Sequence, residues 1–306
     1  MRGFACKEAG WAAKARTMTD DGFTWREWSA PDGLTLRYRD YEGSSDRAPV
    51  ICLHGLTRNS RDFADLAEHL SSDRRVIVPD MRGRGKSDYG PDPANYNVPT
   101  YVDDLIALRE QSGITRYVAI GTSMGGLMTL AQAAKDAEPI IASVLNDIGP
   151  EVAPAGLDKI KTYVGQGRNF PTWVHAARAL QDVHSPSHPA FELEDWIAMA
   201  KRTMTMCSNG RIAFDYDLKI AEPILDAPDD VSAVPPDLWP GFERLAAKPM
   251  LLIRGELSDL LTTETFAEMK RRAPEAQIIE VPETGHAPTL TEPEAMAAID
   301  AFLRRV

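Results

Sequence analysis

Residues 119–126 read Ala-Ile-Gly-Thr-Ser-Met-Gly-Gly, and they overlap the end of a short apolar run, Tyr117 to Ile120. The run is typical of a buried strand, and the Ala- and Leu-rich stretch that follows is typical of a helix. A Gly-x-Ser-x-Gly sequence between a strand and a helix predicts a tight turn that exposes the serine hydroxyl above a sheet. We therefore interpret Ser123 as a candidate nucleophile, with an ordinary glycine-rich turn as the alternative.

A serine hydroxyl attacks poorly until a histidine, oriented by a carboxylate, accepts its proton. His286 stands beside a glycine just after the last apolar run, Gln277 to Val281, and Asp259 follows the run before it. The order Ser123, Asp259, His286 is the chain order of the triads that accompany this serine motif. These three residues are the predicted catalytic triad, and a solvated loop is the alternative for Asp259.

The rest of the chain alternates between apolar strands and helical patterns. Strands are predicted at 24–28, 35–39, 50–53, 76–78, 117–120, 142–145, 250–253 and 277–281, and helices around 63–70, 101–111, 126–135, 263–272 and 293–304. Continuously apolar strands that alternate with helices indicate an α/β protein with a mostly parallel eight-stranded sheet covered on both faces. The first two strands are predicted to pair as an antiparallel hairpin.

This alternation stops between about Pro150 and Lys248, where helical patterns continue without a clear strand. We predict a helical insertion after the sixth strand. The resulting division is a leader at 1–21, a core formed by 22–149 and 246–306, and the insertion at 150–245.

Two further motifs produce a resemblance to a known family. His54-Gly55 follows the third predicted strand, and Asp-Met-Arg-Gly-Arg-Gly-Lys-Ser-Asp, residues 80–88, follows the fourth. With the serine motif, they make the chain similar to the α/β-hydrolase superfamily from about residue 24 to the C-terminus. The resemblance implies an α/β-hydrolase fold with a helical cap at the insertion. It also implies an oxyanion hole formed by the backbone amides of Leu56 and Met124.

The resemblance leaves two positions open for the triad acid. Asp147 follows the sixth predicted strand, where some superfamily members carry the acid. Asp259 is favoured, because its spacing to His286 is the commoner arrangement in the superfamily. Asp147 is then a structural or cap-anchoring residue.

The insertion is rich in aromatic and methionine side chains, which serve as ordinary packing or together form an apolar pocket for the substrate. The candidate pocket residues are Arg58, Trp173, Trp196, Met204, Trp239 and Leu260.

The charge balance disfavours several classes of partner. The chain carries 34 basic and 45 acidic side chains, a net charge of −11, which disfavours nucleic acid and anionic membrane surfaces. Three scattered cysteines, no secretory signal pattern and no apolar run of membrane-spanning length predict a cytoplasmic protein. We expect a small-molecule substrate and a monomer or homodimer.

Neither a cofactor nor a metal is predicted. The 80–88 segment has Asp80 where a phosphate-binding P-loop requires glycine, and Asp88 where a dinucleotide fingerprint requires its third glycine. His184 and His188 could share a metal only on one helix face, and Pro186 interrupts such a helix.

The predicted activity is hydrolysis of a small or medium, largely apolar carboxylic ester or lactone through an acylated Ser123. One alternative is hydrolysis of a carbon–carbon bond in a ring-cleavage product, with Arg58, Arg168 or Arg211 as partner of the substrate carboxylate. A second alternative is a non-catalytic ligand-binding receptor on the same fold.

Overall fold

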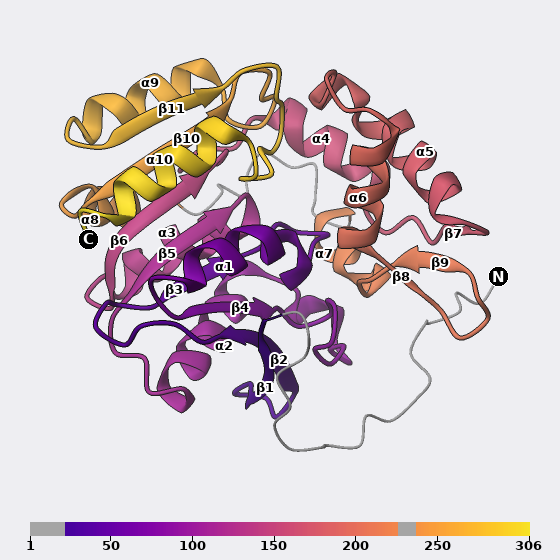
Figure 1. Cartoon of the computed structure of the whole chain (residues 1–306), viewed down its shortest axis with the longest axis horizontal. Helices are drawn as coiled ribbons and strands as arrows, with labels where there is room; N and C mark the ends of the chain where they lie inside the picture. Colours follow the sequence, from indigo (N-terminus) through magenta and orange to yellow (C-terminus); the bar gives the residue numbers. More distant parts are fainter. Residues whose placement is uncertain (1–21, 226–236) are drawn as a thin grey trace.

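The computed structural model describes residues 22–225 and 237–306. The predicted leader, 1–21, and residues 226–236 of the predicted insertion lie outside the described residues. The described residues form an eight-stranded sheet with helices on both faces and a separate three-stranded sheet (Figure 1).

The large sheet confirms the eight predicted strands. They are β1 (Thr24–Ser29), β2 (Thr35–Tyr41), β3 (Val50–Leu53), β4 (Val76–Asp80), β5 (Tyr117–Thr122), β6 (Ile140–Asn146), β10 (Met250–Gly255) and β11 (Gln277–Val281). Their spatial order is β1-β2-β4-β3-β5-β6-β10-β11. β1 and β2 form the predicted antiparallel hairpin, β2 pairs antiparallel with β4, and the remaining pairs are parallel.

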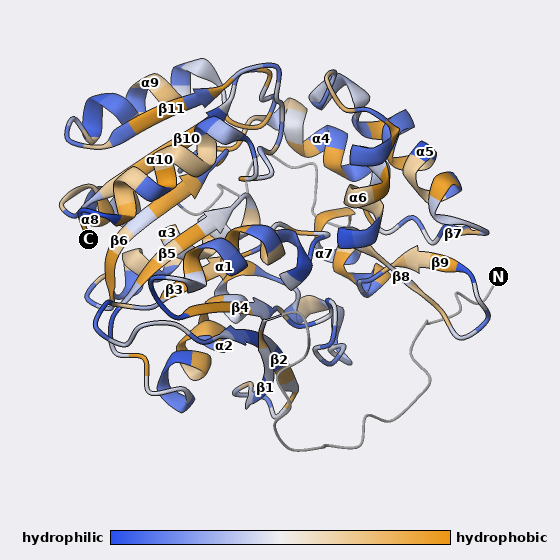
Figure 2. Cartoon of the chain, in the orientation of Figure 1, coloured by the Kyte–Doolittle hydropathy of each residue, from blue (hydrophilic) through white to orange (hydrophobic). Residues whose placement is uncertain are grey.

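Every residue of β3, β4, β5 and β10 is buried, as expected for strands that are covered on both faces. Figure 2 shows β6 and β10 mostly in the colour of hydrophobic residues. Side chains alternate between two apolar cores. Ile51 and Leu53 belong to one core, and Val50 and Cys52 belong to the other.

Helices cover both faces. They are α1 (Ala64–Ser71), α2 (Val98–Gln111), α3 (Met124–Lys135), α8 (Trp239–Ala246), α9 (Thr263–Arg272) and α10 (Pro293–Leu303), with short 3-10 turns at η1 (Ser60–Phe63) and η2 (Pro93–Asn95). α2, α3, α8 and α9 contribute to the first core, and α1 and α10 to the second. Of the helices in residues 22–225 and 237–306, none has the length and apolar character that a membrane crossing requires.

The inserted segment, defined here as residues 154–225, lies beside the carboxyl ends of the parallel strands (Figure 1). It contains α4 (Pro154–Tyr163), α5 (Trp173–His184), η3 (Ser185–Ser187), α6 (Leu193–Thr203), η4 (Leu218–Ala221) and α7 (Glu222–Leu225). It also contains β7 (Asn169–Phe170), β8 (Met204–Met206) and β9 (Ile212–Phe214), paired in the order β7-β9-β8. The segment thus has the predicted helices and, in addition, three short strands that the sequence analysis did not predict. Strands of two or three residues are too short to produce an alternating pattern.

The carboxyl end of the predicted insertion also differs from the structure. α8 packs on α3, and Phe242 of α8 is buried in the same core as the large sheet. A Cβ atom on Gly241 would lie 2.1 Å from the carbonyl oxygen of Leu130, so the two helices are in close contact. α8 therefore belongs with the helices that cover the sheet.

Candidate active site

Ser123 occupies the sharp turn between β5 and α3, with φ 52° and ψ −117°. A positive φ is uncommon for a residue other than glycine and indicates a turn that the surroundings hold in place. A Cβ atom on Gly125 would lie 2.0 Å from the carbonyl oxygen of Leu53, and one on Gly121 would lie 2.6 Å from the backbone of Gly125. Glycine is needed at both positions because the backbone of the turn packs directly against β3 and against itself.

His286 connects Ser123 to a buried carboxylate. Its Nε2 lies 2.9 Å from the Ser123 Oγ, and its Nδ1 lies 2.8 Å from Oδ2 of Asp147. An ionised carboxylate only accepts hydrogen bonds, so the ring proton is assigned to Nδ1. Nε2 is then free to accept the proton of the serine hydroxyl.

The structure corrects the predicted partner of His286, which is Asp147 and not Asp259. Asp259 instead forms an ion pair with Lys159 of α4, with 2.6 Å between its Oδ2 and the lysine Nζ. Both side chains of this pair are about a third exposed, at 37% and 31%. β6 lies between β5 and β10 in the sheet, and Asp147, the residue after β6, reaches His286 from there. The spacing of residues along the chain does not show whether the carboxylate after β6 or the one after β10 reaches the loop that carries His286.

Asp147 is fully buried, and its carboxylate is bound by the last residue of β10 and by the loop that follows this strand. The amide of Gly255 donates to Oδ1 at 2.8 Å, and the hydroxyl of Ser258 donates to Oδ2 at 2.7 Å. Buried carboxylates need such donors, because burial removes their hydrating water. The sequence analysis did not single out Ser258, and its position next to Asp259 in the expected acid loop was the available signal.

The two predicted oxyanion amides belong to Leu56, which follows β3, and to Met124, which follows β5 and Ser123, and these two strands are neighbours in the sheet. Met124 is the first residue of α3, and the first amides of a helix have no acceptor within it. Leu56 follows His54, whose ring is fully buried, with Nδ1 bonded to the carbonyl of Gly55 at 2.8 Å and Nε2 accepting from the amide of Met81 at 3.1 Å. Burial lowers the pKa of His54 to about 4, so this ring is a neutral anchor for the loop.

Arg84 contacts both Leu56 and Met124, and the sequence analysis missed it. Its Nε donates to the carbonyl oxygen of Leu56 at 3.0 Å, and its Nη2 lies 3.7 Å from the sulfur of Met124. Its Nη1 donates to the hydroxyl of Tyr101 at 2.9 Å. The available signal was the Asp80–Asp88 motif, in which Gly85 takes a φ of 52° and passes close to the carboxylate of Asp80. This turn carries Arg84 into the interior.

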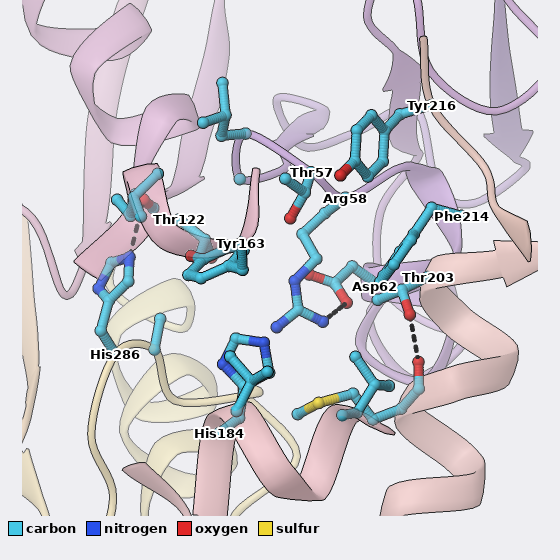
Figure 3. A pocket seen from close by; sticks show the side chains of 18 of the residues that line it. Thr57, Arg58, Asp62, Thr122, Tyr163, His184, Thr203, Phe214, Tyr216 and His286 are labelled. Carbon is cyan, nitrogen blue, oxygen red and sulfur yellow. Dashed lines mark hydrogen bonds and ion pairs between the residues drawn. The ribbon is translucent and has the colours of Figure 1, made fainter. Parts of the chain in front are cut away.

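A cavity opens beside Ser123, between the carboxyl ends of β3 and β5 and the inserted segment. Figure 3 shows Arg58, Tyr163, His184 and Tyr216 around it. Most of the lining is apolar, with side chains such as those of Phe170, Leu180 and Phe214, and arginine and aspartate side chains also reach it. No group of three or more His, Cys, Asp or Glu side chains in the described residues could hold a metal ion.

Of the six predicted pocket residues, the structure places Arg58 in the cavity lining and the other five elsewhere. Trp196 and Met204 are buried in the apolar core of the inserted segment itself, and Trp173 packs against that core. The segment projects from the sheet and must bury its own large side chains, which explains why they do not face the substrate.

Of the remaining two predicted pocket residues, Leu260 belongs to the main core and Trp239 packs against it. Leu260 is 2% exposed there, and its side chain packs closely against Gly156. Trp239 donates from Nε1 to Glu151 at 2.8 Å and lies beneath the guanidinium of Arg272, at 3.9 Å from the ring centroid.

A model of the alpha/beta hydrolase family matches residues 50–299. The chain belongs to the alpha/beta hydrolase family. It is 34% identical over 278 residues to the 3-hydroxybutyrate-oligomer hydrolase of Cupriavidus necator, covering 89% of this chain and 94% of that protein. It is 26% identical to the 2-(acetamidomethylene)succinate hydrolase of Mesorhizobium japonicum, covering 88% of this chain and 92% of that protein.

The chain is 54% identical in sequence to an alpha/beta hydrolase from Novosphingobium aromaticivorans whose structure has been solved. The two superpose with a TM-score of 0.88, covering 93% of this chain and 99% of the other. The fold and the relatives are those of hydrolases.

Proposed function

We propose that this alpha/beta hydrolase cleaves carboxylic esters or lactones through an acyl intermediate on Ser123. The observation that carries the proposal is the continuous chain of contacts from Ser123 Oγ to His286, at 2.9 Å, and from His286 to Asp147, at 2.8 Å. A hydroxyl within hydrogen-bond distance of an oriented imidazole is the arrangement that makes serine a nucleophile.

In the first half of the reaction, the Ser123 oxygen attacks the ester carbonyl while Nε2 of His286 accepts its proton. The amides of Leu56 and Met124 donate to the oxygen that becomes negatively charged. Collapse of this tetrahedral adduct breaks the carbon–oxygen bond, and the imidazolium protonates the departing alcohol. A lactone reacts in the same way, except that the alcohol stays attached to the acyl group.

In the second half, water attacks the acyl carbon and His286 takes its proton. The acid leaves and Ser123 recovers its hydrogen. Asp147 stays ionised throughout, holding the Nδ1–H tautomer and stabilising the imidazolium, and the buried donors from Gly255 and Ser258 keep it in place.

The name of the relative from Cupriavidus necator supports ester chemistry, because oligomers of 3-hydroxybutyrate are joined by ester bonds. The proposal is tested with a fluorophosphonate probe and p-nitrophenyl acetate and butyrate. We expect labelling of the wild type and none of Ser123→Ala, with turnover of the variant reduced by roughly 10⁴ to 10⁶. Circular dichroism checks that the variant is folded. Retention of more than a tenth of wild-type turnover would contradict a serine mechanism.

One observation favours a second candidate, hydrolysis of a carbon–carbon bond in a ring-cleavage product, which requires a cation for the substrate carboxylate. Arg58 and Arg168 line the cavity, whereas Arg211 donates to the carbonyl of Asn169 in the small sheet. Adding such a ring-cleavage product to the substrate panel distinguishes the two activities. A non-catalytic receptor would leave the fluorophosphonate probe unattached.

A further inference from the structure

We propose that the cavity beside Ser123 takes substrates that carry a carboxylate, and that Arg58 binds this group. The inference rests on the proposed ester hydrolysis and adds the substrate class. It concerns a group remote from the reacting carbonyl, so it can fail while the serine chemistry holds.

Arg58 is placed in the cavity by its backbone. It lies in the loop after β3, where its amide donates to the carbonyl of Gly55 at 3.2 Å and closes a turn. The side chain lines the same cavity as Ser123 and His286 and is 23% exposed. The guanidinium of Arg58 lies between Asp62 on one side and His184 and His286 on the other (Figure 3).

The donors of Arg58 are largely unused by the protein. Among the described residues, its guanidinium makes one hydrogen bond, 3.4 Å from Nη1 to Oδ1 of Asp62, near the upper limit for such a bond. Structural arginines of this chain are bound far more fully. Arg82, for example, donates to Asp104 at 2.7 and 2.6 Å and to Asp32 at 2.6 and 3.2 Å. Arg58 therefore retains N–H groups for a ligand.

The charge of the cavity is opposite to that of the chain. The chain carries a net charge of −11, yet the side chains that line the cavity include two arginines, Arg58 and Arg168, and one carboxylate, Asp62. Burial, followed by the charge of Arg58, lowers the pKa of His184 to about 3, so this ring is neutral and offers a hydrogen-bond donor or acceptor. Arginine keeps its charge at every relevant pH and binds a carboxylate through two parallel N–H bonds.

The test compares esters that differ only in charge. One series carries the group on the acyl side, in the monoethyl esters of succinic, glutaric and adipic acid and their neutral carboxamides. The other carries it on the alcohol side, in 3-acetoxybutanoate and 3-acetoxybutanamide. We expect wild-type kcat/KM to favour the carboxylate over its matched carboxamide by about 10- to 100-fold in at least one series, the range of charge-assisted hydrogen bonds.

Arg58→Gln removes the charge and keeps a polar side chain of similar reach. We expect it to bring the ratio of kcat/KM for the carboxylate to kcat/KM for its matched carboxamide down to about one, with most of the loss for the carboxylate in KM. Arg58→Lys keeps the charge without the paired donors and should retain part of the preference. The matched control is Arg178→Gln, because Arg178 is exposed on α5 and donates to Gln181. This control should retain the full preference.

Three outcomes overturn the inference. They are an equal or better reaction of the carboxamides with the wild type, an equal loss for both members of a pair in Arg58→Gln, and an unchanged preference in that variant. If no ester in either series reacts, protection of Ser123 from fluorophosphonate by adipate replaces turnover as the readout. Failure of adipate to protect better than adipamide then overturns the inference. A wild type that the probe does not label would instead contradict the serine mechanism itself.

Discussion

Asp147 and Ser123 share an unusual backbone conformation, with φ of 55° and 52°. Strained residues of this kind persist where the surrounding structure fixes them, and they gather at active sites. At Asp147 the amide donates to the carbonyl of Ile253 at 2.8 Å, and the carboxylate is bonded to Gly255, Ser258 and His286. The acid is therefore held from both its backbone and its side chain.

The first prediction separates the two carboxylates. Asp147→Asn should lower kcat by about 10⁴, because an amide can donate to Nδ1 and favours the wrong imidazole tautomer. Asp259→Asn breaks an ion pair with Lys159 whose side chains are about a third exposed, worth roughly 0 to 1 kcal/mol, and should lower kcat by less than about tenfold. Steady-state kinetics on a p-nitrophenyl ester measure both. A larger loss of kcat in Asp259→Asn than in Asp147→Asn would instead identify Asp259, in the loop after β10, as the triad acid.

At the scale of elements, the site is assembled from loops at the carboxyl ends of neighbouring strands. β3 leads to Leu56, β5 to Ser123 and β6 to Asp147, and these three strands are adjacent in the sheet. The loop after β4 carries Arg84 to the carbonyl of Leu56 and the sulfur of Met124. We expect this loop to position the oxyanion amides.

The second prediction tests that support. Arg84→Met fills a similar space without donors, so the Leu56 loop should lose its fixed orientation, and kcat should fall by about 10- to 100-fold with little change in KM. The thermal midpoint of each variant reports the structural loss separately. Arg84→Lys should recover part of kcat. A purely structural arginine would lower the thermal midpoint and leave kcat of the folded variant unchanged.

Across the whole molecule, several histidines are buried in their neutral form. Burial lowers the pKa of His54 and of His188 to about 4, against the ordinary 6.5 of an exposed ring. The folded chain therefore binds fewer protons than the unfolded chain between these values. By linkage, this contribution to stability is complete above pH 6.5 and is lost as the pH falls toward 4.

The third prediction concerns this acid sensitivity. For wild type, the free energy of unfolding should fall between pH 7 and pH 5, and His54 alone should account for about 2 kcal/mol of the fall. His54→Gln should reduce the pH dependence by that amount, whatever its effect on stability at pH 7. Urea unfolding at both pH values measures it. His175→Gln, at an exposed position of α5, is the control. An unchanged slope in His54→Gln would contradict the prediction.

The sequence by itself determined the sheet, the elbow and the histidine. Ser123 lies in a local motif whose glycines are required by contacts within a few residues and with the adjacent strand, and His286 follows the last strand of a regular alternation. Such local patterns can be recognised in a sequence because each depends on a backbone geometry that only particular residue types adopt easily.

Only the tertiary structure decided which carboxylate reaches His286, which side chains line the cavity and what Arg84 contacts. Asp147 and Asp259 each follow a strand, and the choice between them depends on the lateral order β5-β6-β10 and on the direction in which each loop turns. The sequence likewise did not indicate that Trp196 would be buried in the core of the inserted segment and that Arg58 would line the cavity. Burial depends on the packing of segments far apart in the chain, and that packing is a property of the assembled fold.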